Sequence, residues 1–346
     1  MALQGSGAIK FSDITAEFGT PSGKNLGAFR VSQSVGEKVF PLDNGVPSSG
    51  PIKFSDFYNK QLTIVIDYHS GGNTNRVQAP DQWNANNVTV IGGHRSKPGA
   101  INSSEWQGGK KIVIHVNKTI GSVNNSNNTR CALRTGSWRA DTELVIDVGG
   151  EGRIYGAGGK GGDGANGSST GENGTTGTSA LGIQYSGGTV VNIASGGIIQ
   201  RGFGGGGGGG GGHQSDKGSR RYASGGGGGG GQGRPGGARG DRGSGGAQGG
   251  NGTAGSTSAA GEGGGGSDNG GEAQGGAGGE GGWTGDTSAD SGGGGGGDTR
   301  GSGGSGGGNG AAIRRASGVS EGSITVNNSG TVNPNSNTTS AATGVS

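Results

Sequence analysis

The sequence predicts a mainly β fold in which a glycine-rich insertion, expected to form a polyglycine-II helix bundle, interrupts a solenoid-like series of β repeats. Three observations lead to this prediction. Residues 201–310 hold 56 of the 95 glycines. Residues 61–200 contain β-branched runs and lack helical periodicity. The repeated unit that precedes the glycine-rich segment continues after it, so both ends of the insertion are anchored in one scaffold.

Residues 1–60 contain an internal repeat. The string AIKFSDI at 8–14 recurs as PIKFSDF at 51–57, 43 residues later. Ser12 and Ser55 are the predicted caps of short helices over 13–18 and 56–61, because a serine side chain accepts a hydrogen bond from the first turn. The apolar residues before the caps are expected to be extended and half buried; they are Ile9, Phe11, Ile52 and Phe54.

The string LGAF at 26–29 is interpreted as a degenerate middle copy of this repeat. Sixty residues with a few short elements make only a small apolar core. We therefore expect this segment to be stable mainly against a partner.

Residues 61–148 are predicted to form strands. Each candidate is rich in β-branched residues and most end at glycine or asparagine. The candidates are 62–68, 87–91, 111–116 and 142–148. Because no helical pattern interrupts them, this region is expected to be all-β.

A longer repeat consists of a strand, a glycine or asparagine turn, a short apolar pair, and an excursion that returns at Ala-Leu or Ala-Ile. Its copies begin at 112, 144 and 190, and a final half-copy begins at 324. Units that cannot bury a face alone stack on their neighbours. The largest excursion returns at Ala312-Ile313, so the glycine-rich tract is an insertion in the third copy rather than a linker.

The glycine tract cannot bury an apolar core. Runs of nine, seven and six glycines begin at 204, 225 and 292 and are separated by longer, varied segments. A flexible linker is the simplest interpretation of the composition. The anchored ends and varied segments favour extended rods, each rising about 3.1 Å per residue, joined by loops.

Several classes of function find no support in the sequence. A net charge of +3 does not indicate nucleic-acid binding, and a single cysteine, Cys131, excludes a disulfide framework. The N-terminal residues lack the basic and apolar regions of a signal peptide, so none is expected, and no apolar run approaches the 18 residues of a membrane span. The nucleophile-elbow string at 303–307 and the GxGxxG string at 156–161 are expected by chance in such sequence. We therefore expect no enzyme activity, no metal and no cofactor.

The charged and aromatic residues of the tract suggest a binding surface. Segment 213–242 is rich in arginine, whereas 243–299 has only acidic charges. These charges could simply keep a glycine-rich body soluble. Alternatively, the basic segment binds anionic groups of a cell surface, and the two large aromatic residues bind protein or sugar. The candidate binding residues are Tyr222, Trp283, Arg220, Arg221, His213, Lys217, Arg234 and Arg239.

The IKFSD repeat at 9–13 and 52–56, with EFG at 17–19 and VPSSG at 46–50, resembles the N-terminal segment of many tailed-phage tail and fibre proteins. The β repeats and glycine runs resemble the distal tail-fibre adhesins of T-even-type phages. The chain departs from that family in its β region at 62–200 and in its fewer, longer glycine runs. The resemblance implies an attachment domain that caps a trimeric fibre. It also implies a sandwich of polyglycine-II helices whose loops recognise outer-membrane proteins or sugars.

These expectations define five regions: an attachment module (1–60), a β-repeat neck (61–200), a glycine-rich receptor-binding domain (201–310), returning strands (311–332) and a polar tail (333–346). The protein is expected in the virion tail, after synthesis in the host cytoplasm, with a trimeric tail-fibre protein and a host surface protein or glycan as partners. The alternatives are a structural tail, baseplate or capping protein, and a polysaccharide-degrading spike. The candidate fibre-attachment residues are Ile9, Phe11, Ile14, Phe18, Ile52, Phe54 and Phe57.

Overall fold

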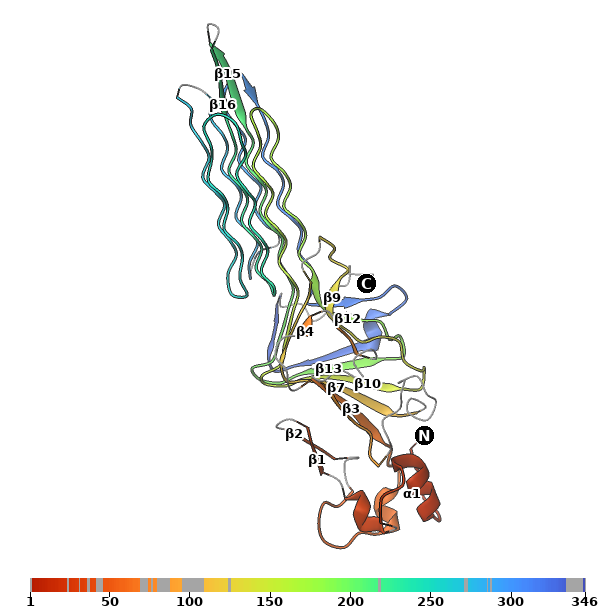
Figure 1. Ribbon diagram of the computed structural model, residues 1–346. Helices are drawn as coiled ribbons and strands as arrows, with labels where there is room; N and C mark the ends of the chain where they lie inside the picture. The colour runs from red at the N-terminus through yellow and green to blue at the C-terminus, as the bar shows by residue number, and fades with distance from the viewer. Residues whose placement is uncertain are drawn as a thin grey trace.

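The protein is elongated, with helices at one end and a small β-sheet at the other in the computed structural model (Figure 1). The prediction of a mainly β protein is confirmed. The structure describes residues 2–23, 25–30, 32–35, 38–41, 46–68, 74–75, 77–79, 88–94, 109–123, 126–216, 219–270, 273–284, 286, 288–333 and 345. The predicted polar tail at 333–346 therefore lies almost entirely outside the described residues.

The N-terminal module contains three short helices, α1 (Phe11–Phe18), η1 (Leu26–Phe29) and η2 (Phe54–Phe57). A hairpin of β1 (Ser32–Val35) and β2 (Lys38–Pro41) follows η1. The predicted caps Ser12 and Ser55 are wrong. The helices begin two residues earlier than predicted, at Phe11 and Phe54, because the aspartates of the IKFSD strings bond back to the lysine N–H groups. Phe11 and Phe54 are thus helical rather than extended.

The module packs against the β region of the same chain. Glu17 of α1 forms a buried ion pair with Lys110 and accepts a 2.7 Å hydrogen bond from the Leu62 N–H. His94 bonds to the Ala28 carbonyl oxygen at 2.7 Å. The buried side chains of the module belong to the same apolar cluster as those of the β region. The module is therefore stabilised within the chain, and not only by an external partner as the sequence suggested.

Three sheets form the β region, and nearly all of their strand pairs are parallel. The first sheet contains β6 (Val88–Ile91), β3 (Thr63–Tyr68), β7 (Lys111–Val116), β10 (Glu143–Val148), β13 (Thr189–Ile193) and β19 (Ile324–Asn328). The second contains β4 (Thr74–Asn75), β8 (Thr119–Gly121), β11 (Arg153–Tyr155), β14 (Ile198–Gln200) and β20 (Thr331–Asn333). The third contains β5 (Val77–Gln78), β9 (Cys131–Arg134), β12 (Ser179–Ile183) and β18 (Ile313–Arg315).

Each predicted repeat contributes one strand to each sheet in the same order. The third copy, for example, runs β13, β14 and, after the glycine tract, β18. The predicted return at Ala312-Ile313 is confirmed, because Ile313 pairs with Leu181 in parallel. A further copy that the sequence analysis missed precedes the others and consists of β3, β4 and β5. The excursions of the three predicted copies leave between the second and third sheets, so they lie at one corner of the β region.

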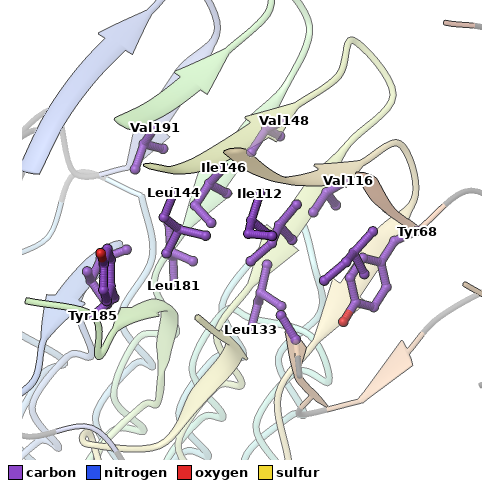
Figure 2. Close-up of a cluster of buried hydrophobic side chains, with 14 of the residues drawn as sticks. Tyr68, Ile112, Val116, Leu133, Leu144, Ile146, Val148, Leu181, Tyr185 and Val191 are labelled. Carbon is purple, nitrogen blue, oxygen red and sulfur yellow. The ribbon is translucent and has the colours of Figure 1, made fainter. Parts of the chain in front are cut away.

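A continuous apolar core fills the space between the sheets. Figure 2 shows Ile112, Leu144 and Ile146 of the first sheet facing Leu133 and Leu181 of the third. Equivalent strand positions carry equivalent residues, such as Ile64, Ile112 and Leu144 in one ladder, and all are essentially unexposed. Burial of such ladders is the main apolar stabilisation of the chain, because little apolar surface exists beyond residue 203.

Extended rods form the far half of the molecule (Figure 1), which we call the glycine bundle and define as residues 156–178 and 201–310. The rod at 204–212 lies at its centre. Its N–H groups point in turn to three neighbours: Gly208 donates to Glu172, Gly209 to Gly226 and Gly210 to Gly293, at 2.8, 2.8 and 2.9 Å. Its carbonyl oxygens accept from three further rods around it. Backbone hydrogen bonds therefore take the place of an apolar core.

The packing of rods explains why the first two runs are pure glycine. A Cβ built at Gly206, Gly209 or Gly228 lies 2.0–2.2 Å from a backbone oxygen of a neighbouring rod. The third run, at 292–297, lies on the outside of the bundle, and a Cβ at Gly294 lies 3.7 Å from the nearest atom. In this outer run glycine is needed for space only where the rod faces the bundle, as at Gly292 and Gly295, where a Cβ would lie 2.1 Å from a backbone oxygen.

Outer rods carry side chains on the face that points away from the bundle. Several of these side chains accept hydrogen bonds from the N–H groups of adjacent rods: Asn173 from Ser305 at 2.8 Å, Asn251 from Arg242 at 2.9 Å, and Thr253 from Glu262 at 2.7 Å. These side-chain oxygens satisfy backbone N–H groups that face no further rod. Residues 156–178 form two such rods, although the sequence analysis counted them with the neck.

Candidate functional site

The turns of the glycine bundle lie alternately at its two ends, because the rods run up and down its length. The far end, which we call the tip, contains the turns at 166–170, 212–223, 244–247, 268–274 and 297–300. The end beside the β region, which we call the base, contains the turns at 233–236, 256–259 and 283–288. A nine-residue rod separates the two ends by about 28 Å.

A three-stranded antiparallel sheet forms the centre of the tip. It consists of β15 (Gly212–Asp216), β16 (Ser219–Ala223) and the two-residue β17 (Thr299–Arg300). His213 and Tyr222 pair across β15 and β16, and their rings lie 4.6 Å apart at 32°. This sheet holds the two rings together at the end of the central rod.

Hydrogen bonds from other turns fix the tip sheet. Arg221 Nη1 donates to the Gly270 carbonyl oxygen at 3.0 Å, and Asn269 Nδ2 donates to the Tyr222 carbonyl oxygen at 2.8 Å. The Ser215 N–H donates to Asp298 Oδ2 at 3.0 Å. Arg220, Arg221 and Arg300 remain exposed. The tip therefore presents arginine side chains and two half-buried rings, tilted toward each other, on a framework held by several turns.

Trp283 does not belong to this surface. It lies at the base, where the Asp286 carboxylate accepts a 3.0 Å hydrogen bond from the Trp283 N–H. Arg201, which directly follows β14, donates to the Asp286 carbonyl oxygen and lies 4.9 Å from the Phe203 ring. Burial lowers the pKa of the Arg201 guanidinium, and nearby Asp286 opposes this shift. Trp283 itself is 51% exposed, so it is accessible at the opposite end of the bundle from Tyr222.

The remaining receptor-binding candidates are scattered. Arg234 lies in a turn at the base, where its carbonyl oxygen accepts from the Ser122 N–H at 3.1 Å. Arg239 lies on the side of an outer rod, and its Nε lies 3.5 Å from Asp241 Oδ1. Lys217 lies outside the described residues. Of the eight candidates, the structure brings together His213, Arg220, Arg221 and Tyr222 at the tip.

The acidic residues of the tract lie partly on one side of the bundle. Glu262, Glu280 and Asp290 line a groove between three outer rods. Within the described part of the chain, no three histidine, cysteine or carboxylate side chains are grouped as a metal site would require. The helices described here are also too short or too polar to cross a membrane.

The fibre-attachment candidates divide by burial. Ile14, Phe18 and Phe57 are at most 1% exposed and form the centre of the N-terminal module. Ile9, Phe11 and Ile52 are half-buried, and Phe54 is 42% exposed. Only the second group is accessible to a partner. The module and the tip lie at opposite ends of the molecule (Figure 1).

Comparisons with known proteins identify a family of phage proteins. A family model described as phage tail fibre adhesin Gp38 matches residues 83–291. Among solved structures, the crystal structure of the gp37-gp38 adhesin tip complex of the bacteriophage S16 long tail fiber matches with a TM-score of 0.41 and 20% sequence identity, over 96% of this chain and 98% of that chain. A search of curated protein sequences finds no significant match.

Proposed function

The chain belongs to the Gp38 family of phage tail fibre adhesins, and we propose that it binds a host outer-surface receptor through the tip of its glycine bundle. Membership of this family places it in the virion tail fibre. The observation that supports the proposal is the set of exposed Arg220 and Arg221 beside half-buried Tyr222, at the end farthest from the N-terminal module. This placement suits a molecule that joins a fibre at one end and contacts a cell at the other.

The glycine bundle is proposed to be a polyglycine-II scaffold. Hydrogen bonds from successive residues of the 204–212 rod to three neighbours in rotation support a helix of three residues per turn. The parallel sheets, with one strand from each repeat, support a β-solenoid neck. Loops fixed on such a scaffold lose less conformational entropy on binding than free loops do.

The receptor chemistry proposed for the tip is an anionic or hydrogen-bond-accepting group. Arginine binds phosphate and carboxylate with two parallel N–H bonds, and the His213–Tyr222 pair offers a flat surface to a sugar or protein loop. Lipopolysaccharide phosphates and acidic loops of outer-membrane proteins both fit this description. The N-terminal module, at the other end, is proposed to bind the tail-fibre protein.

Phage adsorption to host cells tests the proposal. A variant with Arg220→Ala, Arg221→Ala and Tyr222→Ala is expected to lower the adsorption rate at least about tenfold, since charged and aromatic anchors dominate interfaces. Trp283→Ala, at the base, is the matched control and should adsorb normally. Wild-type adsorption by the folded triple variant would exclude the tip as the receptor-binding surface. Wild-type adsorption to hosts with truncated lipopolysaccharide, compared with adsorption to protease-treated hosts, would distinguish the two receptor classes.

A further inference from the structure

The N–H groups of a rod point in three directions in turn, because the rod has three residues per turn. In the outer rod at 275–282, two of these directions lead to the central rod at 204–212 and to the neighbouring rod at 260–267. The third direction belongs to Ala277 and Glu280. Neither N–H group has an acceptor among the residues that the structure describes, and both residues are exposed.

The outer rods on either side leave the same kind of direction open. Gly263 in one and Gly294 in the other donate to no described acceptor. The carbonyl oxygen of Gly278, between them, accepts from no described donor. A chain lying along these rods would therefore meet donors and acceptors that repeat about every 9 Å, the rise of one turn. We call this surface the open face and define it as the rods at 260–267, 275–282 and 289–296.

Side chains close the opposite face of the bundle. That face lies across the two inner rods, 204–212 and 224–232, and contains the rods at 156–165, 171–178 and 237–243. Its outer N–H groups donate, at N···O distances of 2.6–2.9 Å, to side-chain oxygens of Asp163, Thr175 and Thr178. Within the described part of the chain, no side chain accepts from the N–H groups of Gly263, Ala277 or Gly294. One flat face of the bundle is thus closed and the other is not.

Two glycines of the open face are not required by packing. A Cβ built at Gly293 or Gly294 lies 3.5 or 3.7 Å from its nearest atom, which is an ordinary contact distance. At Gly293 that atom is the Ala277 nitrogen, so a side chain there would lie over an open N–H group. Alanine at such a position would restrict the unfolded chain and raise stability. Glycine at these exposed positions instead keeps the backbone groups accessible.

Acidic side chains border the open face. Glu262, Glu280 and Asp290 line a groove of about 510 Å³ between its three rods. All three side chains are exposed, and none of the described lysines or arginines forms an ion pair with them. Negative charge without a partner favours a cationic occupant, and it disfavours the same face of a second copy of this chain.

We propose that the open face binds an extended, glycine-rich and cationic segment of another protein, which adds to the bundle as a further rod. The backbone of that segment pairs with the open N–H and carbonyl groups, as an added strand pairs with the edge of a sheet. Glycine at the positions that face the bundle lets the two backbones approach closely. Lysine or arginine pairs with the three carboxylates. This contact is separate from the tip and goes beyond the receptor contact proposed there.

Amide hydrogen exchange of the full chain tests the proposal. The probe is a synthetic peptide of repeated Gly-Gly-Arg, about as long as one rod. It is expected to slow exchange of the Ala277 and Glu280 N–H groups at least about tenfold, because both become hydrogen-bonded. A Gly-Gly-Glu peptide of the same length should have no effect, because its carboxylates meet those of the groove.

A capping variant and a matched control locate the binding surface. Gly293→Asn places an amide oxygen over the Ala277 N–H, as asparagine does on other outer rods, and should weaken binding of the Gly-Gly-Arg peptide about tenfold. Gly308→Asn is the control. Gly308 is exposed on the rod at 301–310, and a Cβ there lies 3.8 Å from the nearest atom, so this variant should bind as the wild type does. Thermal unfolding would confirm that both variants are folded.

Three results would overturn the proposal. The first is unchanged exchange in the wild type at Gly-Gly-Arg concentrations up to about 1 mM, the weakest affinity expected for a specific contact. The second is equal protection by the two peptides, or protection confined to the tip. The third is self-association of the wild type that Gly293→Asn abolishes, measured by sedimentation, which would assign the open face to a second copy. None of these results would alter adsorption measured with the tip variants.

Discussion

Replacing Gly206 by alanine should disrupt the glycine bundle from its centre. A Cβ at Gly206 would lie 2.1 Å from the carbonyl oxygen of Gly279, whereas ordinary Cβ contacts begin at 3.4 Å. The two rods must therefore separate by about 1.3 Å, the difference between these distances. Both atoms belong to backbone that is held on every side, so a side-chain rotation cannot relieve the contact.

The cost follows from the hydrogen bonds of Gly206. Its N–H donates to the Gly229 carbonyl oxygen and its own carbonyl oxygen accepts from the Gly162 N–H, both at 2.8 Å. Each buried backbone group left without a partner costs about 1–3 kcal/mol. Alanine offsets about 0.4–1 kcal/mol of this by restricting the unfolded chain. The expected net loss is about 1–5 kcal/mol, a large share of the stability of an ordinary domain.

Gly265→Ala is the matched control. Gly265 is exposed on an outer rod, and no atom lies within 4 Å of a Cβ built there. This variant should be as stable as the wild type or slightly more stable. Calorimetry would compare the unfolding transitions, and amide hydrogen exchange would measure protection of residues 204–212. Equal unfolding temperatures in both variants, together with slow amide exchange of residues 204–212 in Gly206→Ala, would refute the packing argument.

Three further substitutions test other parts of the molecule, each by thermal or denaturant unfolding. Asn251→Ala should cost about 0.5–1.5 kcal/mol by removing the acceptor of the Arg242 N–H, while Asn251→Asp should keep it; equal losses would contradict the capping role. Glu17→Ala should cost about 3–5 kcal/mol, because it leaves Lys110 buried without its carboxylate; restoration of stability in a Glu17→Ala, Lys110→Met double variant would support this cause. Leu181→Ala should cost about 2–5 kcal/mol by opening a cavity in the core, and a loss below 1 kcal/mol would show that the site collapses.

The β repeats could be predicted because their strands carry a local signal. The predicted strand at 111–116 agrees with β7, and that at 142–148 with β10 to within one residue. The first copy was missed because β4 and β5 have two residues each. Strands this short are specified by the neighbours with which they pair, and no sequence window reports such pairing.

The extent of the glycine bundle was harder to predict. Residues 156–178 are less glycine-rich than the tract and contain charged and polar residues. Yet glycine recurs at every third position, as at Gly171, Gly174 and Gly177, and a Cβ at each would lie 1.8–2.4 Å from neighbouring backbone. An outer rod needs glycine only where it faces the bundle. The period of three was therefore the missing signal, and composition alone hid it.

The candidate site was predicted in part for a related reason. Sequence composition identified Tyr222 and Trp283 as the large aromatic residues of the tract, and it could not say that they lie at opposite ends. That separation follows from the rods, because each rod reverses direction and successive turns alternate between tip and base. The turn holding Trp283 is at the base, where Gln232 Oε1 accepts from the Thr284 N–H at 2.9 Å.

The alternation of turns also constrains how such a surface can change. Every rod ends once at the tip and once at the base. At the base, the Arg234 carbonyl oxygen accepts from Ser122 of the neck, and Asp286 accepts from Arg201 and Asn309, where the bundle joins the β region. A change in a base turn therefore disturbs the attachment of the bundle to the β region. In the part of the chain that the structure describes, the tip turns form hydrogen bonds with one another and with the rod ends, which are held by backbone hydrogen bonds that depend little on side chains. Under the proposed function, substitutions that alter receptor choice should be tolerated at the tip and restricted at the base, because the base turns make the contacts that hold the two halves together.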